Sequence, residues 1–404
     1  MPIDKTVLIE NLRKRAKIYG PPSEESNPQR RSSLVSRQDR LAGYPESAFF
    51  AQKNSKITPP GETTAANSVG FSIEANDVGY FAEIGIGTPP TKFKLILDSG
   101  SSDTWVPLPE CVNIDDSRKG CNHATLNRES STLRLTSDNF TITYGTGKVK
   151  GVIVEETLII GGLILTNHAF GGAKSESKEF AGKNVPFDGL MGTGRSLLAN
   201  QKVLTPIEAM SNSGILPGAF IGYALGRVSD GENIGLSTFG GVDNTKFTGD
   251  LTLFPNINTK GFWEGVMSEV KVDGVTILTR RTGILDTGTT LIVAPPADAE
   301  AVHAKIPGSK SDGKGRYTIP CTTKSIVSLS FGGVSWDIKP VDLTFQPVSR
   351  NLAGRCISGI SSGKIGGPRQ WLVGDTFLKG VYFATDATNN QMGLAVINKG
   401  SSSP

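Results

Sequence analysis

The feature that most constrains the fold is a short turn that occurs twice, far apart in the chain. The first copy reads Ile96-Leu97-Asp98-Ser99-Gly100-Ser101-Ser102, and the second reads Ile284-Leu285-Asp286-Thr287-Gly288-Thr289-Thr290. Each is an apolar stretch followed by Asp, a small hydroxyl residue, Gly and two more hydroxyl residues. Apolar runs bounded by Gly and Ser predict strands that enter tight turns. Each Asp is therefore expected at a strand end, beside the N–H groups and hydroxyls of its turn.

The surroundings of the two turns repeat as well. An apolar-apolar-Gly ending follows each Asp after roughly ninety residues, a spacing that indicates an internal duplication. These endings are Leu190-Met191-Gly192 and Leu372-Val373-Gly374. The duplication predicts two similar β lobes, at 73–244 and 245–404, that each present one carboxylate to a shared cleft.

Local patterns place two hairpins and two helices on this plan. A hairpin over 79–97 ends at Asp98, and a second hairpin centred on 141–147 carries Tyr144 at its tip. Tyr144 fits either a movable lid or an ordinary aromatic residue of a strand. Helices are predicted from Thr205-Pro206 to near Gly214 and from Pro296 to Lys305.

Composition excludes some classes of protein. Hydrophobic residues make up 37% and charged residues 20% of the chain, and the 48 glycines suit many short strands with tight turns. No run approaches the roughly 18 apolar residues of a membrane span, so we expect a soluble protein. Residues 1–70 contain 11 basic and 7 acidic residues, which accounts for the whole net charge of +4. Basic residues are scattered elsewhere, so a nucleic-acid surface is not indicated.

Residues 1–72 differ from the rest of the chain. They contain the basic clusters Arg13-Lys14-Arg15 and Arg30-Arg31 among dense Pro, Ser, Asn and Gln. This composition is typical of a disordered tail or of a pro-segment that is removed. The apolar stretch from Thr6 to Glu10 is too short for the core of a signal peptide.

Four cysteines allow three pairings. Two local disulfides are the simplest arrangement, Cys111 with Cys121 and Cys321 with Cys356, and they imply an oxidising compartment. Neither pair has the spacing of a metal site, and the three histidines are far apart in sequence, so no metal or other cofactor is expected.

Seven motifs in order resemble those of the pepsin-like aspartic peptidases, most closely the members secreted by fungi. The motifs are YFAEIGIGTPP, LILDSGSSDTWVP, ITYGTG, PFDGLMG, GILDTGTT, WLVGDTFL and YFATDATNNQMGLA. The resemblance runs from about Val78 to Val396. It implies an all-β bilobal fold with a cleft between the lobes, and endopeptidase activity at acid pH.

The resemblance also implies roles for individual residues. Asp98 and Asp286 correspond to the catalytic pair. Ser99 and Thr287 correspond to the residues that cross-link the two turns, whose glycines are Gly100 and Gly288. Ser102 corresponds to the residue that hydrogen-bonds Asp98. Tyr144, Gly145 and Thr146 correspond to the flap, and Trp105 to the partner of the flap tyrosine. Both expected disulfides match disulfides of the family, and a third family disulfide is absent.

A substrate pocket for large apolar side chains is implied around the flap. Its expected residues are Ile96, Trp105, Phe187, Leu190, Thr289 and Thr290, although the apolar members suit a core equally well. Thr146 stands where some fungal relatives carry an Asp that accepts Lys, so weak cleavage after Lys is expected. Asn139-Phe140-Thr141 is a sequon at which glycosylation of Asn139 is feasible, and the sequence leaves its occupancy open.

The chemistry follows from two adjacent carboxyls that cannot both ionise and therefore share a proton. We expect an acid endopeptidase made as a zymogen, secreted or vacuolar and monomeric, with Lys53 or Lys56 holding the tail on the Asp pair. Its expected partners are protein or peptide substrates and pepstatin-type inhibitors. One alternative is a catalytically silent binding or inhibitory protein of the same fold, which would lose an Asp, a hydroxyl or the flap tyrosine. Another is a glycosidase, which needs carboxyls about 5–9.5 Å apart.

Overall fold

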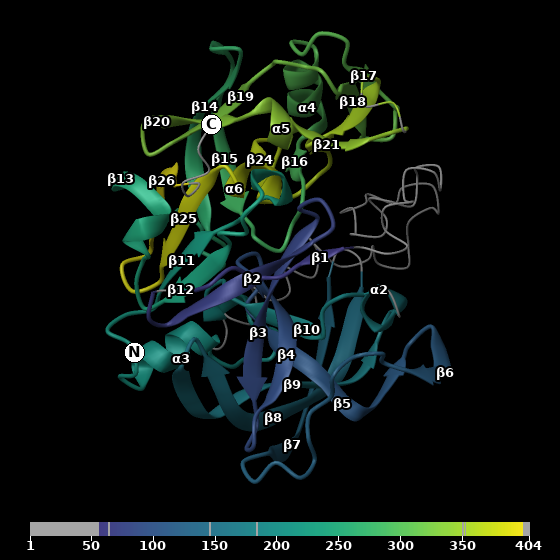
Figure 1. Cartoon of the computed structure of the whole chain (residues 1–404), viewed down its shortest axis with the longest axis vertical. Coiled ribbons are helices and arrows are strands. Elements are labelled where there is room, and N and C mark those ends of the chain that lie inside the picture. The colour runs from purple at the N-terminus through teal and green to yellow at the C-terminus, as the bar shows by residue number, and fades with distance from the viewer. Residues whose placement is uncertain are drawn as a thin grey trace.

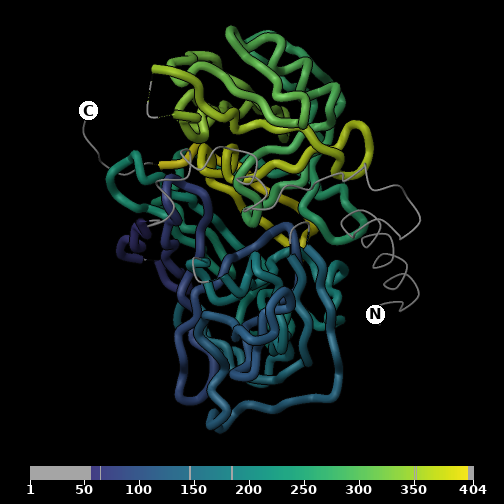
Figure 2. The backbone as a smooth tube through the Cα atoms, turned by 90° about the vertical axis from the view of Figure 1, so that its right-hand side faces the viewer, coloured from purple at the N-terminus to yellow at the C-terminus, as the bar shows by residue number. Residues whose placement is uncertain are grey.

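The computed structural model of the protein describes residues 56–398, except 64, 145–146, 183–184, 350 and 352. Within these residues the strands form sheets of 15, seven and four strands, and the helices are short. The expected all-β fold is confirmed. In Figures 1 and 2 blue to teal strands lie at one end of the molecule and green strands at the other, and yellow segments lie between them.

The bounds of the elements are as follows. The strands of the first half are β1 (Ile57–Thr58), β2 (Ser68–Glu74), β3 (Gly79–Ile86), β4 (Thr91–Asp98), β5 (Thr104–Asn113), β6 (Asp116–Gly120), β7 (Arg134–Thr143), β8 (Lys148–Ile160), β9 (Leu163–Glu176), β10 (Gly189–Gly192), β11 (Phe220–Ala224) and β12 (Leu236–Phe239). Those of the second half are β13 (Phe247–Pro255), β14 (Glu264–Val272), β15 (Val275–Leu285), β16 (Ile292–Ala294), β17 (Lys310–Ser311), β18 (Tyr317–Pro320), β19 (Val327–Phe331), β20 (Val334–Ile338), β21 (Thr344–Pro347), β22 (Arg355–Ser358), β23 (Ile360–Ser362), β24 (Gln370–Val373), β25 (Val381–Asp386) and β26 (Gln391–Ile397). The helices are α2 (Lys178–Ala181), α3 (Pro206–Asn212), α4 (Pro296–His303), α5 (Pro340–Leu343) and α6 (Asp375–Leu378), with 3-10 turns η2 (Ser196–Leu198), η3 (Val228–Asp230) and η4 (Asn244–Lys246).

Strands from both halves of the chain share one sheet. The order β13-β26-β25-β11-β12-β2 continues into β3 and the rest of the first half, because β2 pairs with β12 on one side and with β3 on the other. Two of the expected boundaries fall within or beside this shared sheet. The boundary at 72 falls inside β2, which also pairs with β1, from Ile57 to Thr58. The strands β11 and β12, expected in the first lobe, join it to the second through β25.

The strand that leads into each Asp has a parallel neighbour, and this arrangement occurs in both halves of the chain. The first, β4, pairs with β10, which places Asp98 opposite Gly192, and β15 pairs with β24, which places Leu285 opposite Val373. Both motif glycines are in close contact with backbone. A Cβ on Gly192 would lie 2.5 Å from the backbone N of Asp103, and one on Gly374 would lie 2.1 Å from the carbonyl O of Thr289. Only glycine lets these parallel neighbours approach the Asp turns so closely.

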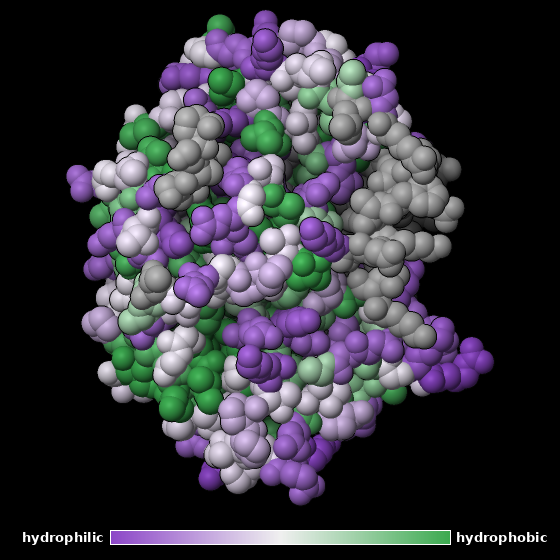
Figure 3. All heavy atoms as spheres, viewed as in Figure 1, coloured by the Kyte–Doolittle hydropathy of each residue, from purple (hydrophilic) through white to green (hydrophobic). Residues whose placement is uncertain are grey.

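The predicted hairpins and helices form with small changes in their bounds. The chain from β3 to β4 is the hairpin that ends in Asp98, and β7 with β8 is the hairpin that carries Tyr144. Helix α3 begins at Pro206, consistent with proline at the first helical turn, and α4 ends at His303 rather than Lys305. No helix in the described part of the chain is long and apolar enough to cross a bilayer. The face drawn in Figure 3 mixes hydrophilic and hydrophobic residues.

Candidate active site

The two Asp turns hold their carboxylates in the same way. The Oδ1 atom of Asp98 accepts a hydrogen bond from the Gly100 N–H at 2.8 Å, and the Oδ1 atom of Asp286 accepts one from the Gly288 N–H, also at 2.8 Å. The Oδ2 atoms accept from hydroxyls three residues further on, those of Ser101 and Thr289. Two donors on each carboxylate fix its plane relative to its own turn.

The hydroxyls of Ser99 and Thr287 cross-link the two turns. The Ser99 N–H donates to Thr287 Oγ1 at 3.0 Å, and the Thr287 N–H donates to Ser99 Oγ at 2.9 Å. Each hydroxyl then donates to the strand on the other side, Ser99 Oγ to the Leu285 carbonyl and Thr287 Oγ1 to the Leu97 carbonyl. This reciprocal set joins residues nearly two hundred positions apart, and it matches the role that the resemblance implied for both residues.

Each carboxylate lies against the glycine of the opposite turn. A Cβ on Gly100 would lie 2.4 Å from Cγ of Asp286, and a Cβ on Gly288 would lie 2.3 Å from Oδ1 of Asp98. Both Asp residues are 7% exposed. Glycine at these two positions therefore allows the carboxyls to meet at the junction of the turns.

Burial and the neighbouring carboxyl change the ionisation of the pair. Burial, followed by the charge of Asp286, raises the pKa of Asp98 well above that of an ordinary aspartate, against the opposing effect of the Ser101 hydroxyl. Because like charges in contact disfavour double ionisation, the carboxylate of Asp286 favours the protonated form of Asp98.

The structure corrects the role expected for Ser102. Its hydroxyl donates to the Arg195 carbonyl at 2.7 Å, and Ser101 is the residue that hydrogen-bonds Asp98. The duplication contained the signal for this, because Ser101 occupies the position of Thr289, which bonds Asp286 at 2.7 Å. Thr289 and Thr290 were expected at the substrate pocket, yet both hydroxyls are used within the fold. Thr290 Oγ1 donates to the Val78 carbonyl at 2.6 Å.

Tyr144, which the resemblance places at the flap, is hydrogen-bonded to Trp105. Trp105 Nε1 donates to the Tyr144 hydroxyl at 2.8 Å, and the Tyr144 N–H donates to the Gly147 carbonyl across the hairpin tip. Gly145 and Thr146, the other expected flap residues, lie outside the described residues.

The apolar residues expected at the pocket form one cluster beside the flap. Ile96, Trp105, Phe187 and Leu190 are buried together, with Tyr144 packed against them. Phe180, which the sequence did not predict at this place, has its ring centroid 5.3 Å from that of Trp105 and 5.5 Å from that of Tyr144. No local pattern pointed to it, since its neighbours in α2 give no strand or motif signal.

Both expected disulfides form. The Cα atoms of Cys111 and Cys121 are 5.4 Å apart, and those of Cys321 and Cys356 are 4.9 Å apart. Asn139 is exposed on β7, and its glycosylation stays a prediction.

Comparisons with known proteins agree with this geometry. Residues 79–397 match the family model described as eukaryotic aspartyl protease. A protein of Arthroderma benhamiae named "Probable aspartic-type endopeptidase CTSD" is 39% identical over 84% of this chain and 64% of its own length. Rhizopuspepsin of Rhizopus chinensis is 35% identical over 76% of this chain and 75% of its own, and the vacuolar aspartic protease of Candida albicans is 35% identical over 78% and 74%.

The match covers most of this chain but only part of some relatives, since it spans 64% of the length of the Arthroderma benhamiae protein. The family model nevertheless covers both Asp turns, the hairpin that carries Tyr144 and the strands of the shared sheet from β3 to β26. The chain therefore belongs to the eukaryotic aspartyl protease family.

Proposed function

We propose that this protein is an aspartic endopeptidase that hydrolyses peptide bonds in proteins at acid pH. The observation that carries the proposal is the pair of cross-linked turns, in which each Asp carboxylate lies against the glycine of the opposite turn. A non-enzymatic binding or inhibitory protein would not need this reciprocal arrangement. In this chain both Asp residues and both cross-linking hydroxyls are present.

The reaction needs a nucleophile for the peptide carbonyl carbon and a proton for its oxygen. The ionised carboxyl of the Asp98–Asp286 pair takes a proton from a water molecule, and the protonated carboxyl hydrogen-bonds the substrate carbonyl oxygen. Water then adds to the carbonyl carbon to give a tetrahedral intermediate. Transfer of a proton to the nitrogen releases the amine, and the pair returns to its singly protonated state.

A preference for large hydrophobic residues beside the scissile bond follows from the apolar cluster of Ile96, Trp105, Phe187 and Leu190 next to Tyr144. Burying a large apolar side chain against such a cluster contributes roughly 1.5–3 kcal/mol. With Thr146 rather than Asp at the flap, cleavage after Lys is expected to be weak. A peptide with Lys before the cleaved bond that is cut as fast as its Phe counterpart would contradict this.

The N-terminal region supports synthesis as a zymogen, because the excess positive charge of the chain lies in residues 1–70. Acid protonates carboxylates that pair with such a segment and so weakens its hold. Since β1 and β2 belong to the body of the protein, removal of the segment should end before Ile57. The two disulfides support an oxidising compartment, and the names of some relatives, such as vacuolar protease A of Aspergillus fumigatus, support a vacuolar or secreted location.

The decisive experiment measures hydrolysis of denatured haemoglobin and of a quenched peptide from about pH 2 to about pH 7. It compares the acid-treated protein with and without pepstatin, and with Asp98→Asn, Asp286→Asn and the exposed control Asp138→Asn. We expect acid-optimal cleavage that pepstatin blocks, that both dyad variants lose and that the control keeps. A folded wild-type protein that cleaves nothing after acid removal of residues 1–55 would favour the silent binding protein.

A further inference from the structure

The α2 turn presents Phe180 to the flap but is too short to hold itself in place. It has four residues, and its N-cap residue Ser177 makes no side-chain cap. The Phe180 and Ala181 N–H groups donate to the Ser177 carbonyl. A single turn of this kind is marginal without outside partners for its end groups. The position of Phe180 therefore depends on the residues that hydrogen-bond the two ends of α2.

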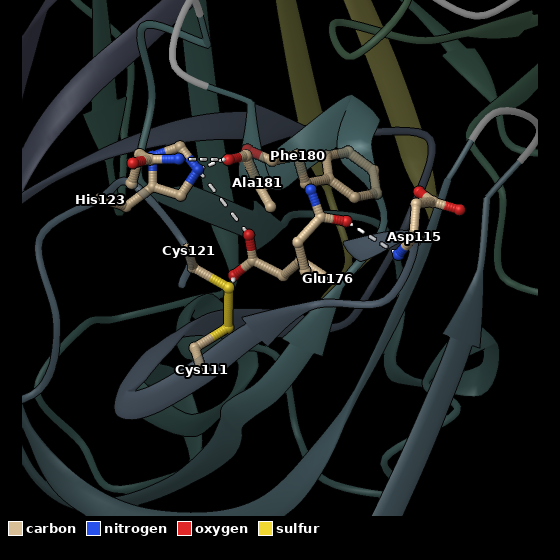
Figure 4. The surroundings of a disulfide bond; sticks show 9 residues. Cys111, Asp115, Cys121, His123, Glu176, Phe180 and Ala181 are labelled. Carbon is tan, nitrogen blue, oxygen red and sulfur yellow. Dashed lines mark hydrogen bonds and ion pairs between the residues drawn. A yellow bond between two sulfur atoms is a disulfide. The ribbon is translucent and has the colours of Figure 1, made fainter. Parts of the chain in front are cut away.

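Those partners come from the loop that the Cys111–Cys121 disulfide closes and from the two residues after it (Figure 4). Asp115 Oδ2 accepts a hydrogen bond from the Lys178 N–H at 2.8 Å. Asn122 Nδ2 donates to the Ala181 carbonyl at 2.9 Å, and His123 Nε2 donates to the Phe180 carbonyl. Both ends of α2 are thus held by one segment.

The ring of His123 lies among hydrogen-bond acceptors. Besides the Phe180 carbonyl, Nε2 lies 3.7 Å from Glu176 Oε2 and Nδ1 lies 4.0 Å from Asp188 Oδ1, and the side chain is 3% exposed. A carbonyl cannot donate, so the proton must sit on Nε2 in the neutral ring. Burial lowers the pKa of His123, against the Phe180 carbonyl and Asp188, which raise it. The neutral ring with Nε2–H is sufficient for the contact with α2.

A metal site is a weaker explanation for this cluster. Sulfur atoms of Cys111 and Cys121 and an oxygen of Glu176 lie within 4.8 Å of one another. The two sulfurs are bonded to each other, however, so neither is a thiolate that could bind a metal.

We propose that His123 and Asn122 are positioning residues that hold α2, and with it Phe180, against Tyr144, and so set the preference for a large side chain beside the scissile bond. The proposal rests on the proposed peptidase function. The Phe180 ring makes edge contacts with the rings of Trp105, Tyr144 and Phe187, and the centroids of Phe180 and Phe187 are 6.5 Å apart. A displaced α2 would therefore open the apolar wall next to the flap.

The test compares two quenched peptides that differ only in Phe or Ala before the cleaved bond. His123→Leu keeps a buried side chain but loses the donor, whereas His123→Gln keeps an N–H in reach of the Phe180 carbonyl. We expect His123→Leu to raise KM for the Phe peptide about tenfold, as the loss of one buried hydrogen bond predicts. The kcat for the Phe peptide, and both kcat and KM for the Ala peptide, should stay within about twofold of the wild type. His123→Gln should restore most of the loss. Asn122→Ala, at an exposed position, should change the Phe peptide in the same direction with less risk to folding.

Two further variants separate positioning from general destabilisation. In a Phe180→Ala background, His123→Leu should have no further effect on the Phe-to-Ala ratio. The control His168→Leu alters a buried histidine on β9 that packs against Phe170, away from α2, and should leave the ratio unchanged. The proposal is overturned if His123→Leu affects both peptides equally, or still shifts the ratio in the Phe180→Ala background. A wild-type protein inactive on both peptides would instead overturn the proposed function.

Discussion

The two hydroxyl residues that follow Gly100 have different functions although they are adjacent in sequence. Ser101 bonds the carboxylate of Asp98, and Ser102 bonds the Arg195 carbonyl behind the turn. Both side chains are buried, at 2% and 1% exposure. The first hydroxyl therefore acts on the ionisation and orientation of the dyad, and the second acts on the stability of the turn.

Replacement of these serines should separate rate from stability. Ser101→Ala removes a hydrogen bond to a charged group, worth about 1.5–3 kcal/mol, so kcat should fall roughly 10–100-fold. In the pH profile of kcat for this variant, the limb set by Asp98 should move to higher pH, because the Ser101 hydroxyl lowers the pKa of Asp98. Ser102→Ala should keep kcat within about threefold and cost about 1 kcal/mol of stability. Steady-state kinetics and thermal unfolding of both variants check this, and equal kcat losses would contradict it.

At the scale of elements, the two Asp turns form a unit only through the exchange between Ser99 and Thr287. The four hydrogen bonds of this exchange join β4 to the end of β15, and each hydroxyl both accepts and donates. Loss of one hydroxyl therefore leaves a buried N–H and a buried carbonyl without their partners.

Thr287→Val should be costly for this reason. The shape of the side chain is kept, but the Ser99 N–H and the Leu97 carbonyl lose their partner, which costs about 1–3 kcal/mol for each unsatisfied group. We expect a lower melting temperature and a large loss of kcat. The control is Thr104→Val on β5, whose hydroxyl is buried at 3% exposure and has no hydrogen-bond partner within the described residues, so its stability should be nearly unchanged. Similar melting temperatures for the two variants would refute the argument.

At the scale of the whole molecule, a buried ionic network connects the two halves beside the shared sheet. Arg227, after β11, makes two hydrogen bonds with Asp342 of α5, at 2.7 and 2.8 Å. Lys379 lies 3.0 Å from Asp77 in the turn before β3 and 3.7 Å from Asp342. Arg227 and Asp342 are 2% and 1% exposed, so neither charge can be satisfied by water if its partner is lost.

Asp342→Asn should therefore destabilise the protein strongly. Breaking a buried pair from one side costs about 3–5 kcal/mol. Arg227 keeps its longer contact of 3.3 Å with Asp230, so we expect a loss toward the lower end of that range. Guanidinium unfolding should show this, beside Glu83→Gln, which breaks an exposed pair with Lys92 and should cost less than about 1 kcal/mol. Joint replacement by Arg227→Met and Asp342→Leu should recover much of the loss, and failure to recover it would count against burial as the cause.

Stability should also depend on pH in opposite ways at the two ends of the range. Burial lowers the pKa of His168 and His303 to about 4, so their contribution is present at high pH and is lost as pH falls from about 6.5 through 4. Burial, and then Asp188, raises the pKa of Glu176 to about 8, so its contribution is present below about pH 4.5 and is lost as pH rises through 8. The protein should be most stable at weakly acid pH.

Glu176→Gln tests the upper end of this range. The neutral amide removes the titration, so the melting temperature at about pH 7.5 should rise relative to the wild type, while that at about pH 4.5 should stay the same. The exposed Glu83→Gln should leave the pH dependence unchanged. A parallel shift of the Glu176→Gln curve at both pH values would exclude ionisation as the cause.

Much of this protein is determined by its sequence alone, because the determining signals are short and repeated. The duplicated Asp turns, the hairpin with Tyr144 and the spacing of the cysteines each depend on a few neighbouring residues, and they predicted the β architecture, the cross-link, both disulfides and the Trp105–Tyr144 contact. Only the tertiary structure decided that Ser101 rather than Ser102 serves Asp98, that β2 joins a sheet built from both ends of the chain, and that Phe180 lies beside the flap. Side-chain direction at a turn, pairing between distant strands and the packing of a four-residue helix depend on partners far away in sequence, and no local pattern specifies them.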